Sequence, residues 1–285
     1  MNVLKTGLLL SVLTALLVFV GQLMGGTSGA TTAFVFALVL NLGTYWFSDK
    51  LVLAMYRAKP LSESEAPQVY RAVREIAMRN TMPMPTLYWL PTATPNAFAT
   101  GRSPKHASVA VTSGLLELMD EAELRGVLAH ELSHVKNRDT LVMSIAAAVA
   151  GAISMVASWA RWGLMFGGSR DDNRRSGNAA LQLVALLIMA ILAPLAAMLI
   201  QLAISRTREY GADETGARLT GNPYGLASAL EKLDRAVRAH PLPNANPATA
   251  HLFIVNPLSA GAIARMFSTH PPIEERVRRL RDLRL

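Results

Sequence analysis

The stretch AHELSHV at residues 129–135 contains two histidines four positions apart, with a glutamate directly after the first. Residues four apart share one face of an α-helix, so His130 and His134 can bind one metal ion from adjacent turns. Glu131 can then reach a water molecule at the open metal position and act as a general base. This is the His-Glu-x-x-His pattern of metalloproteases, and it predicts metal-dependent hydrolysis of peptide bonds. The alternative is a pair of surface histidines beside an unrelated glutamate.

The composition of the 285 residues is unusual for a soluble protein, since 51% are hydrophobic and only 17% are charged. The chain has no cysteine, so histidines and carboxylates must hold any metal ion. The formal net charge of +8 could suit a nucleic acid, but eleven Lys and Arg lie in 49–138 and twelve in 204–285. These blocks avoid the apolar segments, which is typical of the cytoplasmic side of a membrane protein. We therefore expect a lipid bilayer and no nucleic acid as a partner.

Uncharged runs in the sequence are long enough to cross a bilayer, which takes about 20 residues per helix. Residues 6–48 could form two spans joined by a glycine-rich turn at 25–29. Two further runs, 140–160 and 176–205, flank a charged loop and could form two more. The first run could instead be a secretory signal peptide, and the last two could be buried helices of a soluble core.

The remaining segments predict a small domain of mixed helices and strands. Apolar periodicity and capping residues predict helices over 64–80, 120–138, 222–238 and 272–284, with a polar helix over 205–217. Residues 86–91 and 106–112 predict strands, the second with one exposed face, and 241–249 predict a loop. We expect a mainly α-helical membrane protein with about four transmembrane helices and a small α+β zincin domain. The expected parts are 1–56 (two transmembrane helices), 57–138 (first half of the zincin domain), 139–204 (an apolar helical hairpin) and 205–285 (its second half).

A third metal ligand is needed beside the two histidines. Glu209 is the best-placed candidate, because it opens the polar helix that follows the fourth apolar run. Asp213 lies four residues later on the same face and could accept a hydrogen bond from a ligating imidazole. On composition alone, a solvated helix face explains both residues better.

Four motifs together resemble the HtpX-type membrane metalloproteases, which are related to the CaaX prenyl proteases and to the mitochondrial inner-membrane stress protease. The motifs are PNAFATG (95–101), HELSHVKNRD (130–139), SRTREYGADETGA (205–217) and STHPPIEERVRRL (268–280). The resemblance covers the whole chain, including the order of two spans, the metal-binding motif, two apolar runs and the second polar block. It implies a zinc-dependent endopeptidase of the gluzincin type, with one ion per chain. It also implies a multi-pass protein of the bacterial cytoplasmic (inner) membrane whose active site faces the cytoplasm.

The same resemblance implies roles for further residues. Glu209 becomes the third zinc ligand, His270 stabilises the oxyanion of the transition state, and Arg276 is its basic partner. Asn96 lies beside a substrate-binding edge strand. The implied substrates are misfolded or damaged membrane proteins; the alternatives are one dedicated lipidated or prenylated peptide, or a scaffold with a structural zinc site. The sequence leaves the oligomeric state open.

Overall fold

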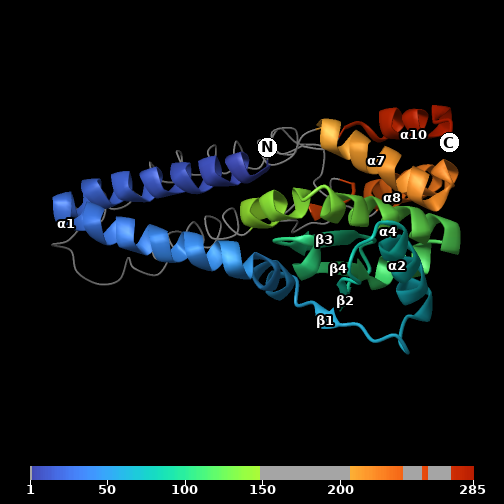
Figure 1. Ribbon diagram of the computed structural model, residues 1–285, viewed down its shortest axis with the longest axis horizontal. Helices are drawn as coiled ribbons and strands as arrows, with labels where there is room; N and C mark the ends of the chain where they lie inside the picture. Colours follow the sequence, from blue (N-terminus) through green and yellow to red (C-terminus); the bar gives the residue numbers. More distant parts are fainter. Residues whose placement is uncertain (1, 148–205, 240–251, 256–270) are drawn as a thin grey trace, which may run out of the picture.

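The computed structural model describes residues 2–147, 206–239, 252–255 and 271–285 (Figure 1). Two long helical arms extend from one end, and the other described elements gather at the opposite end (Figure 1). The helices are α1 (Asn2–Met55), α2 (Pro67–Arg79), α3 (Ser113–Leu118), α4 (Glu121–Lys136), α7 (Arg206–Thr220), α8 (Pro223–Ala239) and α10 (Ile273–Asp282). The strands are β1 (Lys59–Pro60), β2 (Thr86–Leu90), β3 (Ala97–Gly101) and β4 (Ala107–Thr112), with a 3-10 turn η1 (Pro104–His106) before β4.

The two arms belong to α1, which folds back on itself at the predicted glycine-rich turn. Gly26 has φ +57 and ψ −146 there, a backbone conformation that favours glycine. The arms run side by side (Figure 1), and the Asn41 amide donates a hydrogen bond to Thr14 Oγ1 at 2.8 Å. Within the described residues, Gly25–Met55 is long and apolar enough to cross a membrane. The predicted spans at 140–160 and 176–205 lie outside the described residues, apart from helical residues 140–147.

A four-stranded sheet with the order β1-β2-β4-β3 lies beside the end of α1. Its β2 and β4 are parallel and match the two predicted strands, whereas β3, antiparallel to β4, was not predicted. The prediction that 106–112 has an exposed face is wrong, because all six residues of β4 are buried. Val109 faces the main core, and Ala110 faces a second cluster that includes Val52 at the end of α1. The end of α1 therefore covers the sheet face that the alternation pattern assigned to solvent.

The helix α4 lies at the centre of the domain, between the sheet and helices α2, α7 and α8 (Figure 1). All five helices predicted in this part of the chain are confirmed within a few residues of their ends. The first begins at Pro67 and not at residue 64, because Glu65 Oε2 accepts a hydrogen bond from Ser62 N (2.8 Å) in a turn before the helix. The helices pack closely: a Cβ at Gly126 would lie 2.7 Å from the backbone N of Leu226.

Candidate metal centre

The predicted metal-binding helix is α4, and it begins with a capping box. Asp120 Oδ1 accepts a hydrogen bond from Glu123 N, and Glu123 Oε2 accepts one from Asp120 N. The motif residues in the second half of the helix are almost inaccessible: His130 is 2% exposed, Glu131 5% and His134 3%. Burying ionisable side chains is unfavourable unless they are paired or bind a metal ion. This burial excludes the alternative of a surface histidine pair.

The helix α7 crosses α4 at the level of His130 because Gly216 lets the two backbones approach. A Cβ at Gly216 would lie 3.0 Å from His130 N and 3.1 Å from the Ala129 carbonyl carbon. Glu209 and Asp213 precede Gly216 by seven and three residues, so all three share one face of α7. Both carboxylates are therefore directed at α4, and they are only 2% and 4% exposed. The solvated-face reading of this pair is wrong.

Three potential ligand atoms converge from the two helices. The two Nε2 atoms of His130 and His134 lie 3.2 Å apart. Glu209 places Oε2 at 3.7 Å from the His130 Nε2 and Oε1 at 3.5 Å from the His134 Nε2. Ligand atoms around a tetrahedral zinc ion at 2.0–2.1 Å would lie about 3.3 Å from one another. The cluster therefore has the donor types and the spacing of a three-residue metal site.

The other ring nitrogens of the two histidines contact carboxylates. The His130 Nδ1 lies 2.9 Å from Asp213 Oδ1, and the His134 Nδ1 lies 3.3 Å from Asp139 Oδ2. Such carboxylates fix the tautomer and orientation of ligating imidazoles. Asp213 was predicted for this place, but Asp139 was not. The turn that brings Asp139 back to His134 depends on Arg138, which has φ +58.

Arg276 of α10 is fully buried and holds the carboxylate of Asp213, which also contacts His130. Its Nε and Nη2 donate to the two oxygens of Asp213 at 2.8 and 2.7 Å, and its Nη1 lies 3.8 Å from Glu209 Oε2. Burial alone would raise the pKa of Asp213, but the guanidinium outweighs burial and lowers it. Arg276 thus contacts the carboxylates of α7. Its predicted partner His270 lies outside the described residues.

The site has an excess of negative charge. Burial opposes the charged form of His134, but Asp139, Glu209 and Glu131 outweigh burial and raise the pKa of this imidazole to about 9. Metal binding requires both imidazoles to be neutral. In that state four ionised carboxylates would face two guanidinium groups, which leaves two uncompensated negative charges in the described part of the site. The charged groups are Glu131, Asp139, Glu209, Asp213, Arg208 and Arg276. A divalent cation would cancel this excess.

Glu131 points to β3, the edge strand of the sheet. Its Oε2 accepts a hydrogen bond from the backbone N–H of Ala99 at 3.0 Å. Burial raises the pKa of this carboxyl above its ordinary value. Such a shift suits a group that takes up a proton and releases it again.

Asn96 lies one residue before β3, and each of its polar atoms has a partner in the chain. Its backbone N–H and C=O pair with Thr112, and its side-chain amide pairs with the backbone of Leu252 and Ile254. The Ile254 carbonyl in turn accepts a hydrogen bond from Arg276 Nη1 at 3.3 Å. The structure therefore places Asn96 in a network that leads to the buried arginine. A contact between Asn96 and a substrate stays a prediction.

Comparisons with known proteins agree with this geometry. The family described as Peptidase family M48 matches residues 63–284. A "Protease HtpX homolog" of Syntrophobacter fumaroxidans is 59% identical over 280 residues, which cover 98% of each chain. Another of Pyrococcus furiosus is 55% identical over 279 residues, covering 98% of this chain and 95% of its own. These matches confirm the resemblance inferred from the four motifs.

A solved structure shares the fold. The crystal structure of S. mikatae Ste24p aligns with a TM-score of 0.51 and 15% sequence identity. The alignment covers 96% of this chain and 62% of that one. At this identity the likeness concerns the fold alone.

Proposed function

This chain belongs to peptidase family M48 and is a membrane-bound metalloprotease, and we propose that it hydrolyses misfolded or damaged membrane proteins at the cytoplasmic face of the cytoplasmic membrane. The observation that carries the proposal is the buried cluster of His130, His134 and Glu209 with Glu131 on the same helix. This cluster belongs to a domain that directly follows the apolar helix α1. Unfolded segments of membrane proteins would be within reach of such a site.

In the proposed reaction one zinc ion per chain is held by His130, His134 and Glu209. The ion would polarise the peptide carbonyl and activate the attacking water. Glu131 takes the proton from that water and passes it to the leaving amine. Asp139 orients the imidazole of His134 through the other ring nitrogen, so that the ligand is ready before the metal binds.

An extended substrate would pair with the outer edge of β3, the edge that faces away from β4. Asn96, directly before β3, and Thr112 of β4 form a hydrogen-bonded pair. Along antiparallel strands, residues that bond to the neighbouring strand alternate with residues that do not. The N–H and C=O groups of Ala97 and Ala99 are therefore directed away from β4. Ala99 already donates outward to Glu131. We propose that a substrate strand adds at these two residues and takes over the Ala99 N–H that Glu131 accepts from in the structure, which would bring its scissile bond to the base.

Two side chains limit this edge on its C-terminal side. Thr140 Oγ1 donates to the Gly101 carbonyl at 2.9 Å, and Ser144 Oγ accepts from Gly101 N–H at 3.3 Å. The backbone groups of Gly101 are thus occupied by the helix that follows α4. The proposed pairing with substrate therefore ends at Ala99.

The test compares Glu131→Gln with His130→Ala, His134→Ala and Glu209→Ala in the full-length protein. We expect Glu131→Gln to retain zinc and lose casein hydrolysis, and the three ligand variants to lose most of their zinc. The exposed Glu121 at the start of the same helix gives a matched control, and Glu121→Gln should be active. Full activity of Glu131→Gln would refute the role of Glu131 as the base. A zinc-loaded original protein that does not hydrolyse casein would leave only a structural zinc site, which needs ligands but no base.

Substrates and sidedness need separate experiments. Quantitative proteomics of membranes with the active protein and with Glu131→Gln distinguishes many damaged proteins from one dedicated lipidated peptide. A cysteine at Ser103 should react with an impermeant thiol reagent only after cell lysis, since the chain has no other cysteine. Labelling of Ser103→Cys in intact cells would place the domain outside. A cysteine at Ser169 should be labelled from outside if residues 140–204 cross the membrane twice.

A further inference from the structure

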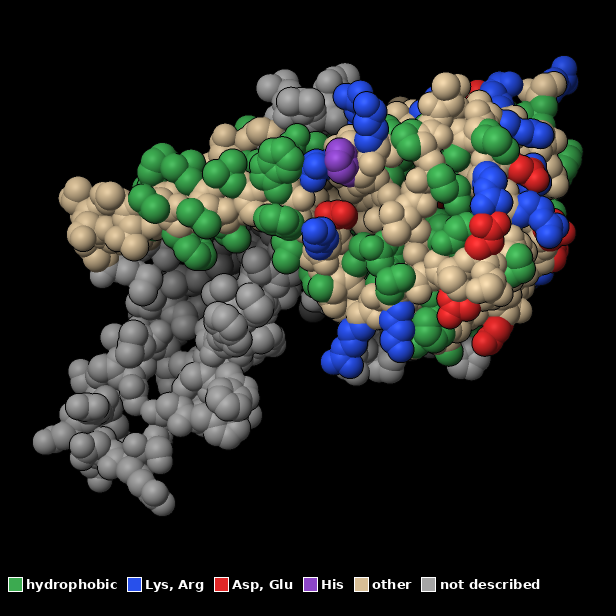
Figure 2. Space-filling model, turned by 60° about the horizontal axis from the view of Figure 1, so that its bottom comes forward, with side chains coloured by type: hydrophobic (Ala, Val, Ile, Leu, Met, Phe, Trp, Pro, Cys, Tyr) green, Lys and Arg blue, Asp and Glu red, His purple; other side chains and the backbone are tan. Residues whose placement is uncertain are grey.

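The junction between α1 and the globular part of the protein carries aromatic and basic side chains. Tyr45, Trp46 and Phe47 are 37, 51 and 52% exposed, and Asp49 and Lys50 follow them. Aromatic residues of this kind gather where the apolar membrane interior meets the headgroups. In Figure 2, apolar side chains gather along the visible part of α1 between its tip and the globular part, where basic, acidic and histidine side chains begin.

The length of α1 places this junction at the edge of the apolar layer. From Gly26 to Phe47 the helix rises about 31 Å, close to the roughly 30 Å thickness of a bilayer interior. At Phe47 the helix kinks again, with φ −118 and ψ 15. The Asn41 amide donates to the Leu10 carbonyl at 3.4 Å, and in this register Trp46 is level with Lys5, the first charged residue. Both arms therefore reach the headgroups at the same level.

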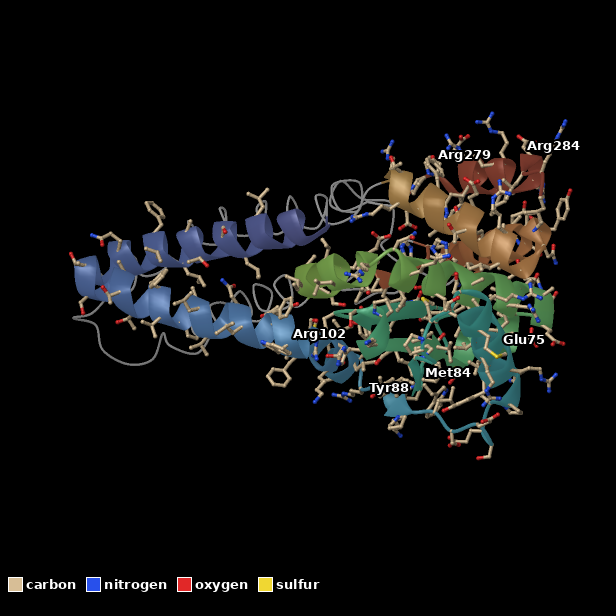
Figure 3. The ribbon with its side chains drawn as sticks, in the orientation of Figure 1. Glu75, Met84, Tyr88, Arg102, Arg279 and Arg284 are labelled. Atoms are coloured by element: carbon tan, nitrogen blue, oxygen red, sulfur yellow. The ribbon has the colours of Figure 1, made fainter. Side chains whose placement is uncertain are left out.

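The β3–β4 loop, residues 101–106, is fastened to the same level. The Arg102 guanidinium lies 4.6 Å from the ring centroid of Trp46, and its Nη1 donates to the Trp46 carbonyl at 3.2 Å. Figure 3 shows Arg102 at the end of α1 next to the sheet. Gly101 has φ +127, and a Cβ there would lie 2.0 Å from the His106 carbonyl oxygen, so this tight loop needs glycine. Lys105 and His106 are exposed on it.

We propose that Lys50, Arg102 and Lys105 form a collar that binds the headgroups of anionic phospholipids. Among the described side chains at this level, these three positive charges outnumber the carboxylate of Asp49, and this excess complements phosphate-bearing lipids of net negative charge. Each basic residue close to an anionic membrane surface strengthens binding to that surface by about fivefold. The proposal rests on the insertion of α1 into a bilayer, which is part of the proposed function, and does not depend on hydrolysis.

The collar would also set the height of the metal centre above the bilayer. Gly101 precedes Arg102 and is held by Thr140 and Ser144 of the helix that directly follows α4. Headgroups that bind Arg102 therefore act on the last residue of β3, the strand that carries Ala99 to Glu131. Binding of anionic lipid would hold this edge strand at a fixed distance from the membrane surface.

The test places an environment-sensitive fluorophore on the cysteine-free chain in nanodiscs. One protein carries Ser103→Cys on the loop, and the control carries Arg284→Cys, at the end of the described molecule that lies away from the arms of α1 (Figure 3). Phosphatidylcholine with a nitroxide on its headgroup should quench the Ser103 label strongly and the Arg284 label weakly. Equal quenching at the two positions would overturn the proposed location of the loop.

The choice of lipid is tested with headgroup nitroxides on phosphatidylglycerol and on phosphatidylcholine at equal mole fraction. The anionic lipid should quench the Ser103 label several-fold more. Lys105→Gln, which leaves the Arg102–Trp46 contact intact, should lower this preference by up to about fivefold. Arg284→Gln removes the same charge at the far end and should leave the preference unchanged. Equal quenching by both lipids, or an unchanged preference in Lys105→Gln, would refute the collar. Both readouts are independent of peptidase activity, so they distinguish failure of this proposal from failure of the proposed function.

Discussion

Gly216→Ala should weaken zinc binding without removing any ligand. The added Cβ would lie 3.0–3.3 Å from three backbone atoms of α4, so the two helices must separate by a few tenths of an ångström. Backbone atoms cannot rotate away as a flexible side chain can. Glu209 and Asp213 are carried on the same rigid helix, so they move with it. Metal sites accept deviations of about 0.2 Å in ligand distance.

The expected size of the effect follows from these displacements. Overpacking of this kind costs about 1–3 kcal/mol, and loss of ligand support typically lowers metal affinity about 10–100-fold. The same helix supplies a matched control in Gly211, where a Cβ would meet no atom within 4 Å. Gly211→Ala should keep full zinc affinity and stabilise α7 by up to about 1 kcal/mol.

Zinc affinity is measured for both variants by competition with a chelator, in detergent and at one pH. Thermal unfolding in excess chelator shows whether each metal-free protein is folded. The reasoning is refuted if Gly216→Ala binds zinc as tightly as the original protein. It is also refuted if Gly211→Ala loses the same affinity, because the cause would then be the helix composition and not the contact with α4.

Three further predictions concern other parts of the site and the domain. Asp139→Ala should lower zinc affinity about 10–100-fold while Asp139→Asn lowers it less, as measured by chelator competition, because the amide can still orient His134. His270→Ala should lower kcat about 10²–10³-fold with little change in KM for a peptide substrate, and an unchanged kcat would return His270 to a structural role. Burial alone would raise the pKa of Glu123, but Lys232 and its other hydrogen-bond partners outweigh burial and lower it from 4.5. A carboxyl whose pKa is lowered by folding stabilises the folded protein above pH 4.5, and this stabilisation is lost as the pH falls through the pKa of the folded state. Lys232→Met should therefore lower the unfolding free energy by about 1.5–3 kcal/mol at pH 7. The difference in Tm from the original protein should shrink towards pH 4, and a constant difference would contradict this account.

Local spacing was enough to predict the residues of α4. His130, Glu131 and His134 lie within two turns of one helix, so their relation follows from helical geometry alone. Glu209 differs, because its place depends on how closely α7 approaches α4. That approach is set by Gly216. In the sequence, neither a glycine nor a polar helix face shows which other helix α7 contacts. Only the resemblance to a known family favoured Glu209 over a solvated face.

Asp139 and β3 were missed for other physical reasons. Asp139 reaches His134 through a left-handed residue at Arg138, and arginine gives no signal for positive φ. The β3 sequence AFATG contains Ala and Gly, which disfavour strands, so its extended form comes from pairing with β4. The burial of β4 on both faces depends on the end of α1, which lies about 50 residues away in the sequence. Such long-range contacts leave no periodic pattern in a single segment.

The charge of the buried site explains why so many ionisable groups can occupy a nearly inaccessible core. Arg276 neutralises one carboxylate at hydrogen-bond distance, but its guanidinium also lies 3.5 Å from the His130 Nε2, on the metal side of the ring. Arg276 would repel a metal ion bound at the His130 Nε2 unless the negative charge of the surrounding carboxylates exceeded the positive charge of Arg276. Glu209 and Glu131 supply that excess, and a bound divalent cation would remove it again. The arginine therefore lets Asp213 be buried as a carboxylate, while the remaining negative charge still favours a metal ion at the histidines.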